Sequence, residues 1–354
     1  MTNKYLYLTL MAVLGFQTSA EAKDGVQRSV PRLVVNIAVD QLRTDYLEAF
    51  APLYGAGGLK RLLAEGMVFA NASFPFAPVD RASAIAAIAT GTTPYYNSIV
   101  GQKWLNRETL RPVGCVDDPK FTGMLTHETA SPAGLATSTL GDELKVATEG
   151  KSQVFAIAPF RDAAILSAGH AADGAFWIDD ETGRWTTSQY YLKNDIVWLQ
   201  GFNDLRSPAE QNTKLTWEPV IELSGSFNYY QHIGNQKPFK HKLTGSRRYI
   251  ELKSSGLVNA YVTDMAQQVA IQQTLGFDRV TDMLSVTYYA GNFDHKAMTE
   301  CQLELQDTYV RLDREIARLI KGLQQKVGDI VKVRVLSVDL KKKRISLTMK
   351  GVKQ

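Results

Sequence analysis

An eight-residue run, LVVNIAVD at residues 33–40, constrains the fold of this chain most strongly. It is apolar at consecutive rather than alternating positions, which is typical of a parallel strand that is covered on both faces. QVFAIAPF at 153–160 and DMLSVTYY at 282–289 are runs of the same kind. Helical patterns separate them, so we expect an α/β fold with a parallel sheet flanked by helices. Because ligands bind at the carboxyl ends of such strands, Asp40 is a candidate site residue.

The segments between these runs indicate helices and one irregular region. Residues 57–69 have an amphipathic pattern, and Gly66 is expected to end that helix. Residues 259–276 and 304–325 are predicted as longer helices. Residues 186–250 are rich in Trp, Tyr, Asn and Pro with weak periodicity, so we interpret them as an insertion that lies over the sheet edge as a cap.

The N-terminus has the pattern of a secretory signal peptide over residues 1–22. Lys4 gives a positive start, residues 5–16 are apolar, and residues 20–22 read Ala-Glu-Ala, an A-x-A cleavage site that makes Lys23 the expected mature start. The alternative is a membrane anchor, but the apolar run is too short to span a bilayer. With no later apolar stretch of that length, we expect an exported protein, periplasmic or secreted, without a transmembrane segment after cleavage.

Charge divides the chain unevenly. From Lys321 onward, ten Lys or Arg face two Asp, a net charge of +8, and the remainder carries −4 of the total +4. Within this basic part, residues 331–339 and 345–349 alternate apolar and polar side chains on either side of KKKR. The pattern predicts a β-hairpin. The difference in net charge between the basic C-terminal part and the rest of the chain suggests two parts of different origin.

The chain has two cysteines, Cys115 and Cys301. In an oxidising compartment they could pair, but the sequence alone cannot say whether they meet, and it favours two buried thiols at least as much as a disulfide.

Several stretches together resemble the alkaline phosphatase superfamily, especially the phosphate-irrepressible alkaline phosphatases and the related nucleotide pyrophosphatase/phosphodiesterases. They are LVVNIAVDQLRTDYL, GGLKRLLAEGMVFANASF, ATGTTPYYNSIVGQKW, AGHAADGAFWIDDETGRWTTSQYY and TDMLSVTYYAGNFDHKAMTECQLELQDTYVRLDREI. The resemblance implies an alkaline-phosphatase-like domain over residues 23–326. It also implies two zinc ions held by Asp and His side chains, and a Thr or Ser hydroxyl at a helix start that attacks phosphorus.

Carried over by position, the resemblance assigns Asp40 and His295 to the metal. The Asp that should pair with His295 falls on Gly291, and Asp294 is displaced in register. The nucleophile position is Arg81, which has no lone pair for attack.

The positions that should grip phosphate are also replaced, by Gln102, Phe160 and Asp162. The remaining family ligands should lie beyond about residue 325, yet no His follows His295. We therefore expect the two-zinc site to be incomplete or absent.

Other readings of the same residues stay open. Asp40 can instead cap a helix or pair with Arg43 or Arg81, and a lone His295 is more often a surface residue than a ligand. Ser83 or Thr90 is a weak candidate for a substitute nucleophile, since Ser83 lies about 200° around the helix from Arg81. Arg81 at a helix start could bind phosphate or another anion.

The tail at 327–354 resembles the last two strands of the OB-fold RNA-binding domain that is repeated in the largest small-subunit ribosomal protein. Two strands lack most of that binding face, and an exported protein rarely meets RNA, so a nucleic-acid partner is disfavoured. We expect a truncated phosphatase-like domain joined near Val327 to an unrelated fragment, by natural rearrangement or as an assembly artefact.

Three functions follow in order of preference. The first is an exported, catalytically degenerate member of the superfamily. The second is a metal-dependent phosphomonoesterase or phosphodiesterase with a rearranged site. The third is nucleic-acid binding through the basic tail, and the sequence leaves the oligomeric state open.

Overall fold

The computed structural model describes residues 30–192, 196–210, 215–220, 239–327, 334–339 and 344–348. The chain divides into two units. The larger unit is built on Pro31–Lys332, and Val333–Lys350 belongs to the other. The expected signal peptide at 1–22 lies outside the described residues.

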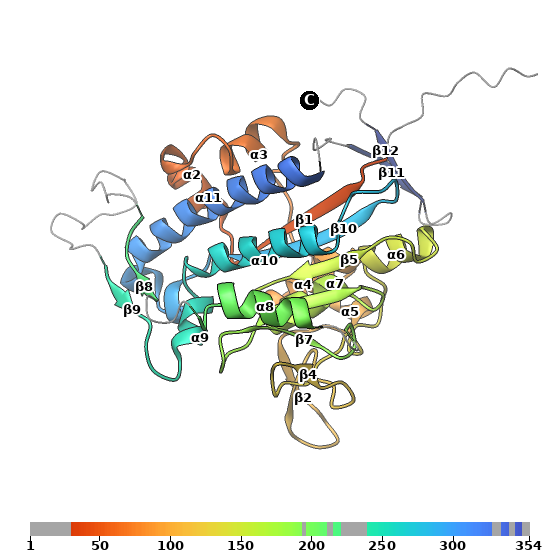
Figure 1. The fold of residues 1–354 in the computed structure, drawn as a ribbon, viewed down its shortest axis with the longest axis horizontal. Helices are drawn as coiled ribbons and strands as arrows, with labels where there is room; N and C mark the ends of the chain where they lie inside the picture. Colours follow the sequence, from red (N-terminus) through yellow and green to blue (C-terminus); the bar gives the residue numbers. More distant parts are fainter. Residues whose placement is uncertain are drawn as a thin grey trace, which may run out of the picture. The chain divides into compact units, whose positions relative to one another are not determined.

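A six-stranded sheet forms the centre of the larger unit (Figure 1). In spatial order its strands are β1 (Leu33–Asp40), β10 (Asp282–Tyr289), β5 (Val154–Ile157), β6 (Gly174–Ile178), β7 (Trp185–Ser188) and β4 (Gly123–Met124). The first four run parallel, and β7 and β4 join antiparallel. All eight residues of β10 are buried, as expected for an apolar run covered on both faces. The α/β class and the three predicted strands are confirmed.

Helices cover both faces of this sheet (Figure 1). One layer contains α10 (Val258–Gln272), α11 (Gln302–Val327) and α8 (Val197–Arg206), and the other contains α4 (Arg81–Thr90), α7 (Arg161–Ala168) and α5 (Pro94–Asn97). The remaining helices are α2 (Thr44–Ala49), α3 (Leu59–Glu65), α6 (Leu140–Ala147) and α9 (Arg248–Lys253), with 3-10 turns at Ala51–Leu53, Phe293–His295 and Met298–Glu300. The three helices expected from periodicity are α3, α10 and α11, and α3 ends at Gly66 as predicted.

The layer that carries α4 and α7 is packed through small side chains. Ala82, Ala86, Ala163 and Ala164 are all fully buried in one core cluster together with Ala156 of β5. Alanine keeps helix propensity high and lets the helices approach the sheet and each other closely. The alanine-rich sequence of α4 therefore brings its first residue close to the strand ends.

The expected cap insertion at 186–250 is partly built into the core. Residues 186–188 belong to β7, so the sheet extends past the predicted start of the insertion. Further on, β8 (Thr216–Trp217) pairs with β9 (His241–Lys242). Trp217 is fully buried and donates to Asp307 of α11 at 2.6 Å.

Three smaller findings complete the fold. Pairs of short strands form at β2 (Lys103–Leu105) with β3 (Pro112–Gly114), and at β11 (Arg334–Asp339) with β12 (Arg344–Thr348), which confirms the predicted C-terminal hairpin. Cys115 and Cys301 are separate buried thiols, so they do not form a disulfide. In the described part of the chain, every helix is too short or too polar to cross a membrane.

Candidate active site

Helix α4 starts at Arg81 because Asp80 caps it. An Asp80 oxygen accepts a hydrogen bond from Ser83 N at 2.9 Å, and the Ser83 hydroxyl accepts one from Asp80 N at 3.0 Å. This reciprocal pairing satisfies amides that have no partner within the helix. The second Asp80 oxygen accepts from Gln102 N at 2.6 Å. One carboxylate therefore positions both the start of α4 and the segment that carries Gln102.

The Arg81 guanidinium is enclosed by groups from distant parts of the chain. Its Nε donates to both oxygens of Asp162, at 3.0 and 3.1 Å. Because a guanidinium only donates, the Gln102 amide is oriented with its oxygen toward Arg81. In that orientation the oxygen accepts from Nη2 at 2.6 Å and from Nη1 at 3.3 Å. The Phe160 ring stacks on the group, with its centroid 3.8 Å from the guanidinium carbon.

Asp40 is the second carboxylate on Arg81, and it is held less closely than Asp162. Its Oδ2 lies 3.6 Å from Arg81 Nη1, too far for a hydrogen bond, and this buried atom has no hydrogen-bond partner among the described residues. Burial raises the pKa of Asp40 to about 6, with Arg81 opposing the rise and Asp162 adding to it. Arg43, the other candidate partner, pairs with Asp45 instead.

The charge of Arg81 itself is secure. Burial alone would lower the pKa of Arg81, but Asp162 and then Asp40 outweigh burial and raise it. Arg81 is therefore a permanent cation between two carboxylates, with 15% of its side chain exposed. The four sequence-predicted residues Gln102, Phe160, Asp162 and Asp40 all meet at this one cation.

A second buried cation, Lys253 of α9, borders the same aromatic ring. Its Nζ lies 5.1 Å from the Phe160 centroid, donates to Ile178 O at 3.0 Å and pairs with Asp180 at 2.6 Å. Lys253 is only 5% exposed. The Phe160 ring therefore contacts two cations, of which Arg81 is paired with Asp40 and Asp162, and Lys253 with Asp180.

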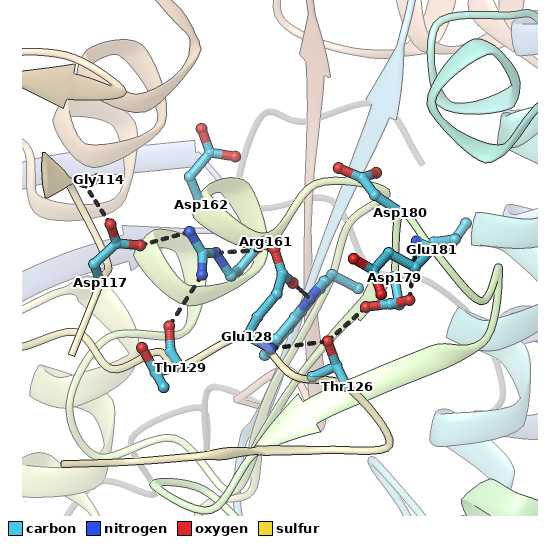
Figure 2. A network of polar contacts seen from close by, with 12 residues as sticks. Gly114, Asp117, Thr126, Glu128, Thr129, Arg161, Asp162, Asp179, Asp180 and Glu181 are labelled. Carbon is cyan, nitrogen blue, oxygen red and sulfur yellow. Dashed lines mark hydrogen bonds and ion pairs between the residues drawn. The ribbon is translucent and has the colours of Figure 1, made fainter. Parts of the chain in front are cut away.

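Arg161 is next to this site in sequence but belongs to another network (Figure 2). It donates to Asp117 Oδ1 at 2.6 Å and to Thr129 O at 3.0 Å, and its Nε lies 3.7 Å from Glu128. Figure 2 shows the carboxylate of Asp162 directed away from Arg161. The adjacent Arg161 and Asp162 therefore have different partners: Arg161 binds Asp117, Glu128 and Thr129, on either side of β4, and Asp162 binds Arg81.

Comparison with known proteins assigns the chain to a family. The family model described as "Type I phosphodiesterase / nucleotide pyrophosphatase" matches residues 34–337, which is most of the chain. The chain belongs to this family. The match extends beyond residue 326, the expected end of the resemblance.

Named relatives of the family agree with this. Alkaline phosphatase PhoV from Synechococcus elongatus is 31% identical over 346 residues, covering 92% of this chain and 63% of that protein. Alkaline phosphatase PafA from Elizabethkingia meningoseptica is 32% identical over 344 residues, covering 93% of this chain and 62% of that protein. The crystal structure of wild-type PafA matches with a TM-score of 0.71 at 30% identity, covering 84% of this chain and 60% of that one. The chain thus spans about three fifths of the length of these relatives.

The residues that the family resemblance assigns to metal do not form a zinc site here. His295 is exposed, and its ring makes no hydrogen bond with any described residue. Asp294 is engaged by Arg247, with its Oδ1 3.1 Å from Arg247 Nη2. A side chain at Gly291 would collide with Gln41 and would come within 2.6 Å of the Tyr289 hydroxyl. In this structure the ends of the Gln41 and Tyr289 side chains therefore occupy the space beside Gly291.

Across the described ranges, no group of three or more His, Cys, Asp or Glu side chains is arranged to hold a metal ion. Asp40, the predicted first ligand, faces the fixed charge of Arg81 instead. The residues present thus do not fit the two zinc ions that the resemblance implies.

The hydroxyls of the two substitute nucleophile candidates, Ser83 and Thr90, both make hydrogen bonds at the ends of α4. The Ser83 side chain is buried and occupied by the Asp80 cap. The Thr90 hydroxyl donates to Ala86 O at 2.7 Å and meets Thr92 Oγ1 at 2.8 Å, at the far end of α4 from Arg81. The Ser83 hydroxyl therefore caps the start of α4, and the Thr90 hydroxyl makes hydrogen bonds at its end.

Sequence reasoning missed two contributors to the site. Asp80 had a local signal, because an Asp three residues before Ser at a helix start is typical of a cap. Lys253 had none, because its approach to Phe160 depends on how α9 packs against the end of β6.

Proposed function

We propose that this member of the phosphodiesterase/nucleotide pyrophosphatase family is catalytically degenerate and does not hydrolyse phosphate esters by the metal-and-hydroxyl mechanism. The supporting observation is the environment of Arg81, which the resemblance aligns with the nucleophile. Arg81 has no lone pair to attack phosphorus, and it stays protonated. Its guanidinium is committed to Asp162, Gln102 and Phe160.

The charge of the site supports the same proposal. A phosphate ester brings negative charge, which transition-state stabilisation must neutralise with cations or donors. Here the two carboxylates of Asp40 and Asp162 outnumber Arg81, and Lys253 is already paired with Asp180. Phosphate or another anion would have to displace Asp162 from Arg81, so we expect this site to bind inorganic phosphate poorly.

The experiment is a paired hydrolysis assay on the purified full chain. p-Nitrophenyl phosphate and bis-p-nitrophenyl phosphate are each supplied with and without added Zn²⁺, and alkaline phosphatase PafA serves as the positive control. We expect no zinc-dependent release of nitrophenol above the buffer rate. Zinc-dependent hydrolysis that Asp40→Ala abolishes would contradict the proposal and favour a rearranged metal-dependent site.

We further propose that the protein is exported. The support is the pattern of residues 1–22, where a positive start and an apolar stretch precede Ala-Glu-Ala. Expression in a bacterial host, followed by fractionation and N-terminal sequencing, tests this. A periplasmic chain that starts at Lys23 is the expected result, and an uncleaved chain confined to the cytoplasm would refute it.

A further inference from the structure

We propose that Arg81 is a built-in cation seated in a preformed guanidinium site, which takes the place of the metal that the family resemblance implies. This inference rests on the proposed function in one respect: both assign the carboxylates of Asp40 and Asp162 to Arg81 rather than to metal. It adds that these surroundings are shaped for a planar organic cation. Removing the side chain should therefore leave a site that selects a guanidinium ion over a divalent metal.

The first argument is the match between donors and acceptors. Asp162 accepts from Nε with both oxygens, and the Gln102 oxygen accepts from both terminal nitrogens. The Phe160 ring covers a face of the group at 3.8 Å. A carboxylate, an amide oxygen and an aromatic face complement a flat, forked cation. Zinc instead prefers a tetrahedral set of Cys, His or carboxylate ligands, for which the amide and the ring are poor substitutes.

The second argument is that other contacts hold these surroundings in place. Asp162 Oδ1 also accepts from Ala163 N at 2.9 Å, and Gln102 N donates to Asp80 at 2.6 Å. Phe160 packs edge-on against Tyr289, with centroids 5.9 Å apart. Asp40 is the last residue of β1, and its carbonyl accepts from Ala290 N at 2.9 Å. None of these contacts involves Arg81, so the site should persist when that side chain is shortened.

The third argument is electrostatic. Without Arg81, two buried carboxylates would face each other without a counter-ion, and breaking such a pair is strongly destabilising. Asp40 Oδ2 has no hydrogen bond among the described residues even with Arg81 present. A small cation that enters the shortened variant should therefore restore stability, because it would bind the folded state and not the unfolded chain.

The experiment is rescue of Arg81→Gly in the full chain, read out as the thermal midpoint Tm. Arg161→Gly is the matched control, because both arginines are the first residue of a helix and Gly changes the backbone alike at each. We expect methylguanidinium to raise the Tm of Arg81→Gly by roughly 2 °C at tenfold its Kd. Wild type and Arg161→Gly should respond only as they do to an equal concentration of urea or salt.

A parallel titration of Arg81→Gly with Zn²⁺ tests the alternative that the site prefers a metal ion. We expect Zn²⁺ to raise the Tm of Arg81→Gly by less than methylguanidinium does. Stabilisation by Zn²⁺ with no response to methylguanidinium would overturn the inference, because the site would then prefer metal. Absence of stabilisation by either cation would also overturn it, since the site would not be preformed.

If Arg81→Gly does not fold, hydrogen exchange of wild type tests the same point. We expect the Arg81 Nε–H to exchange roughly tenfold or more slowly than that of Arg161, with assignments from Arg81→Lys and Arg161→Lys. Equal exchange rates would overturn the inference. These readouts are independent of catalysis: zinc-dependent hydrolysis by wild type would end the proposed function, whereas failed rescue with no hydrolysis would end only this inference.

Discussion

The two helices that build the site, α4 and α7, both begin with an arginine, and the two arginines differ in what surrounds them. A cation at a helix N-terminus is disfavoured by the helix dipole, so each needs compensation from elsewhere. Arg81 obtains it from two buried carboxylates and an aromatic face. Arg161 obtains it from Asp117, Glu128 and the Thr129 carbonyl (Figure 2). The side chains of Asp117 and Glu128 are more exposed than those of Asp40 and Asp162.

The contrast shows that two charged residues adjacent in sequence, Arg161 and Asp162, can belong to different ion-pair networks. Asp162 follows Arg161 directly in sequence, yet it is bonded to Arg81 on the other helix. The Arg81 guanidinium fills a buried site, whereas the Arg161 guanidinium connects α7 to residues 117–129. Burial should therefore set how much each interaction stabilises the fold, and the variants below test that ranking from the largest expected effect to the smallest.

Arg81→Met should have the largest effect. It leaves the buried carboxylates of Asp40 and Asp162 without a counter-charge, so we expect the free energy of unfolding to fall by about 3–5 kcal/mol. Urea denaturation monitored by tryptophan fluorescence measures this. The triple variant Asp40→Asn, Arg81→Met, Asp162→Asn removes every charge of the group and should recover most of the loss. A triple variant as unstable as Arg81→Met would show that packing, not charge, makes the difference.

Asp162→Asn should have an intermediate effect. The amide keeps an oxygen for Arg81 Nε but loses the charge and the second acceptor, so we expect a loss of about 2 kcal/mol. The same urea titration measures it. Asp117→Asn makes the corresponding change at Arg161 and is its control. Equal losses in the two variants would break the proposed difference between the arginines.

The features of the fold and the site that the sequence predicted are those that depend on residues close together along the chain. The apolar runs at 33–40 and 282–289 predicted the parallel strands because burial on both faces leaves a local pattern. The run at 33–40 also predicted that Asp40 lies at the end of a strand. Arg81 was recognisable as an unsuitable nucleophile from its chemistry alone.

Asp40 was one of the pairing alternatives that the sequence offered for Arg81, but the other partners of Arg81 were not predictable in the same way. Phe160 and Asp162 were singled out individually as unsuitable for gripping phosphate, but their joint role needs α4 packed against α7 through alanines, which is a property of the folded chain. The predicted metal role of His295 was already weakened in the sequence, because the Asp that should pair with it falls on Gly291. Only the structure shows that Gln41 and Tyr289 fill the space beside Gly291.

Arg161→Met should have a smaller global effect than either change at the Arg81 site. Its ion pairs are partly exposed, so we expect a loss of about 1 kcal/mol or less. The local effect should be clearer, because Asp117 also accepts from Gly114 N at 2.7 Å. Hydrogen exchange should show faster exchange at Gly114 while the α4 amides stay protected. Faster exchange along α4 would mean that the two arginines belong to one cooperative group.

The smallest effect is expected beyond the other end of α7, where the cation His170 is more exposed than Arg161. His170 directs Nδ1 to Asp142 Oδ2 at 3.1 Å and Nε2 to Leu135 O at 3.0 Å, so the ring satisfies both acceptors only when protonated. The hydrogen bond to Asp142 raises the pKa of His170 above its usual value, although burial opposes it. Its contribution is therefore fully present below the ordinary histidine pKa and is lost as pH rises through the higher folded value.

His170→Gln tests this sign. Gln can still donate to one acceptor but carries no charge, so the Tm difference from wild type should be largest near about pH 5.5 and should shrink toward about pH 8.5. With 37% of the His170 side chain exposed, solvent screens the pair, and the difference should stay below that of Arg161→Met at every pH. A difference that grows with pH would mean that the ring is neutral in the folded protein. A difference as large as that of Arg81→Met would show that burial does not rank these ion pairs.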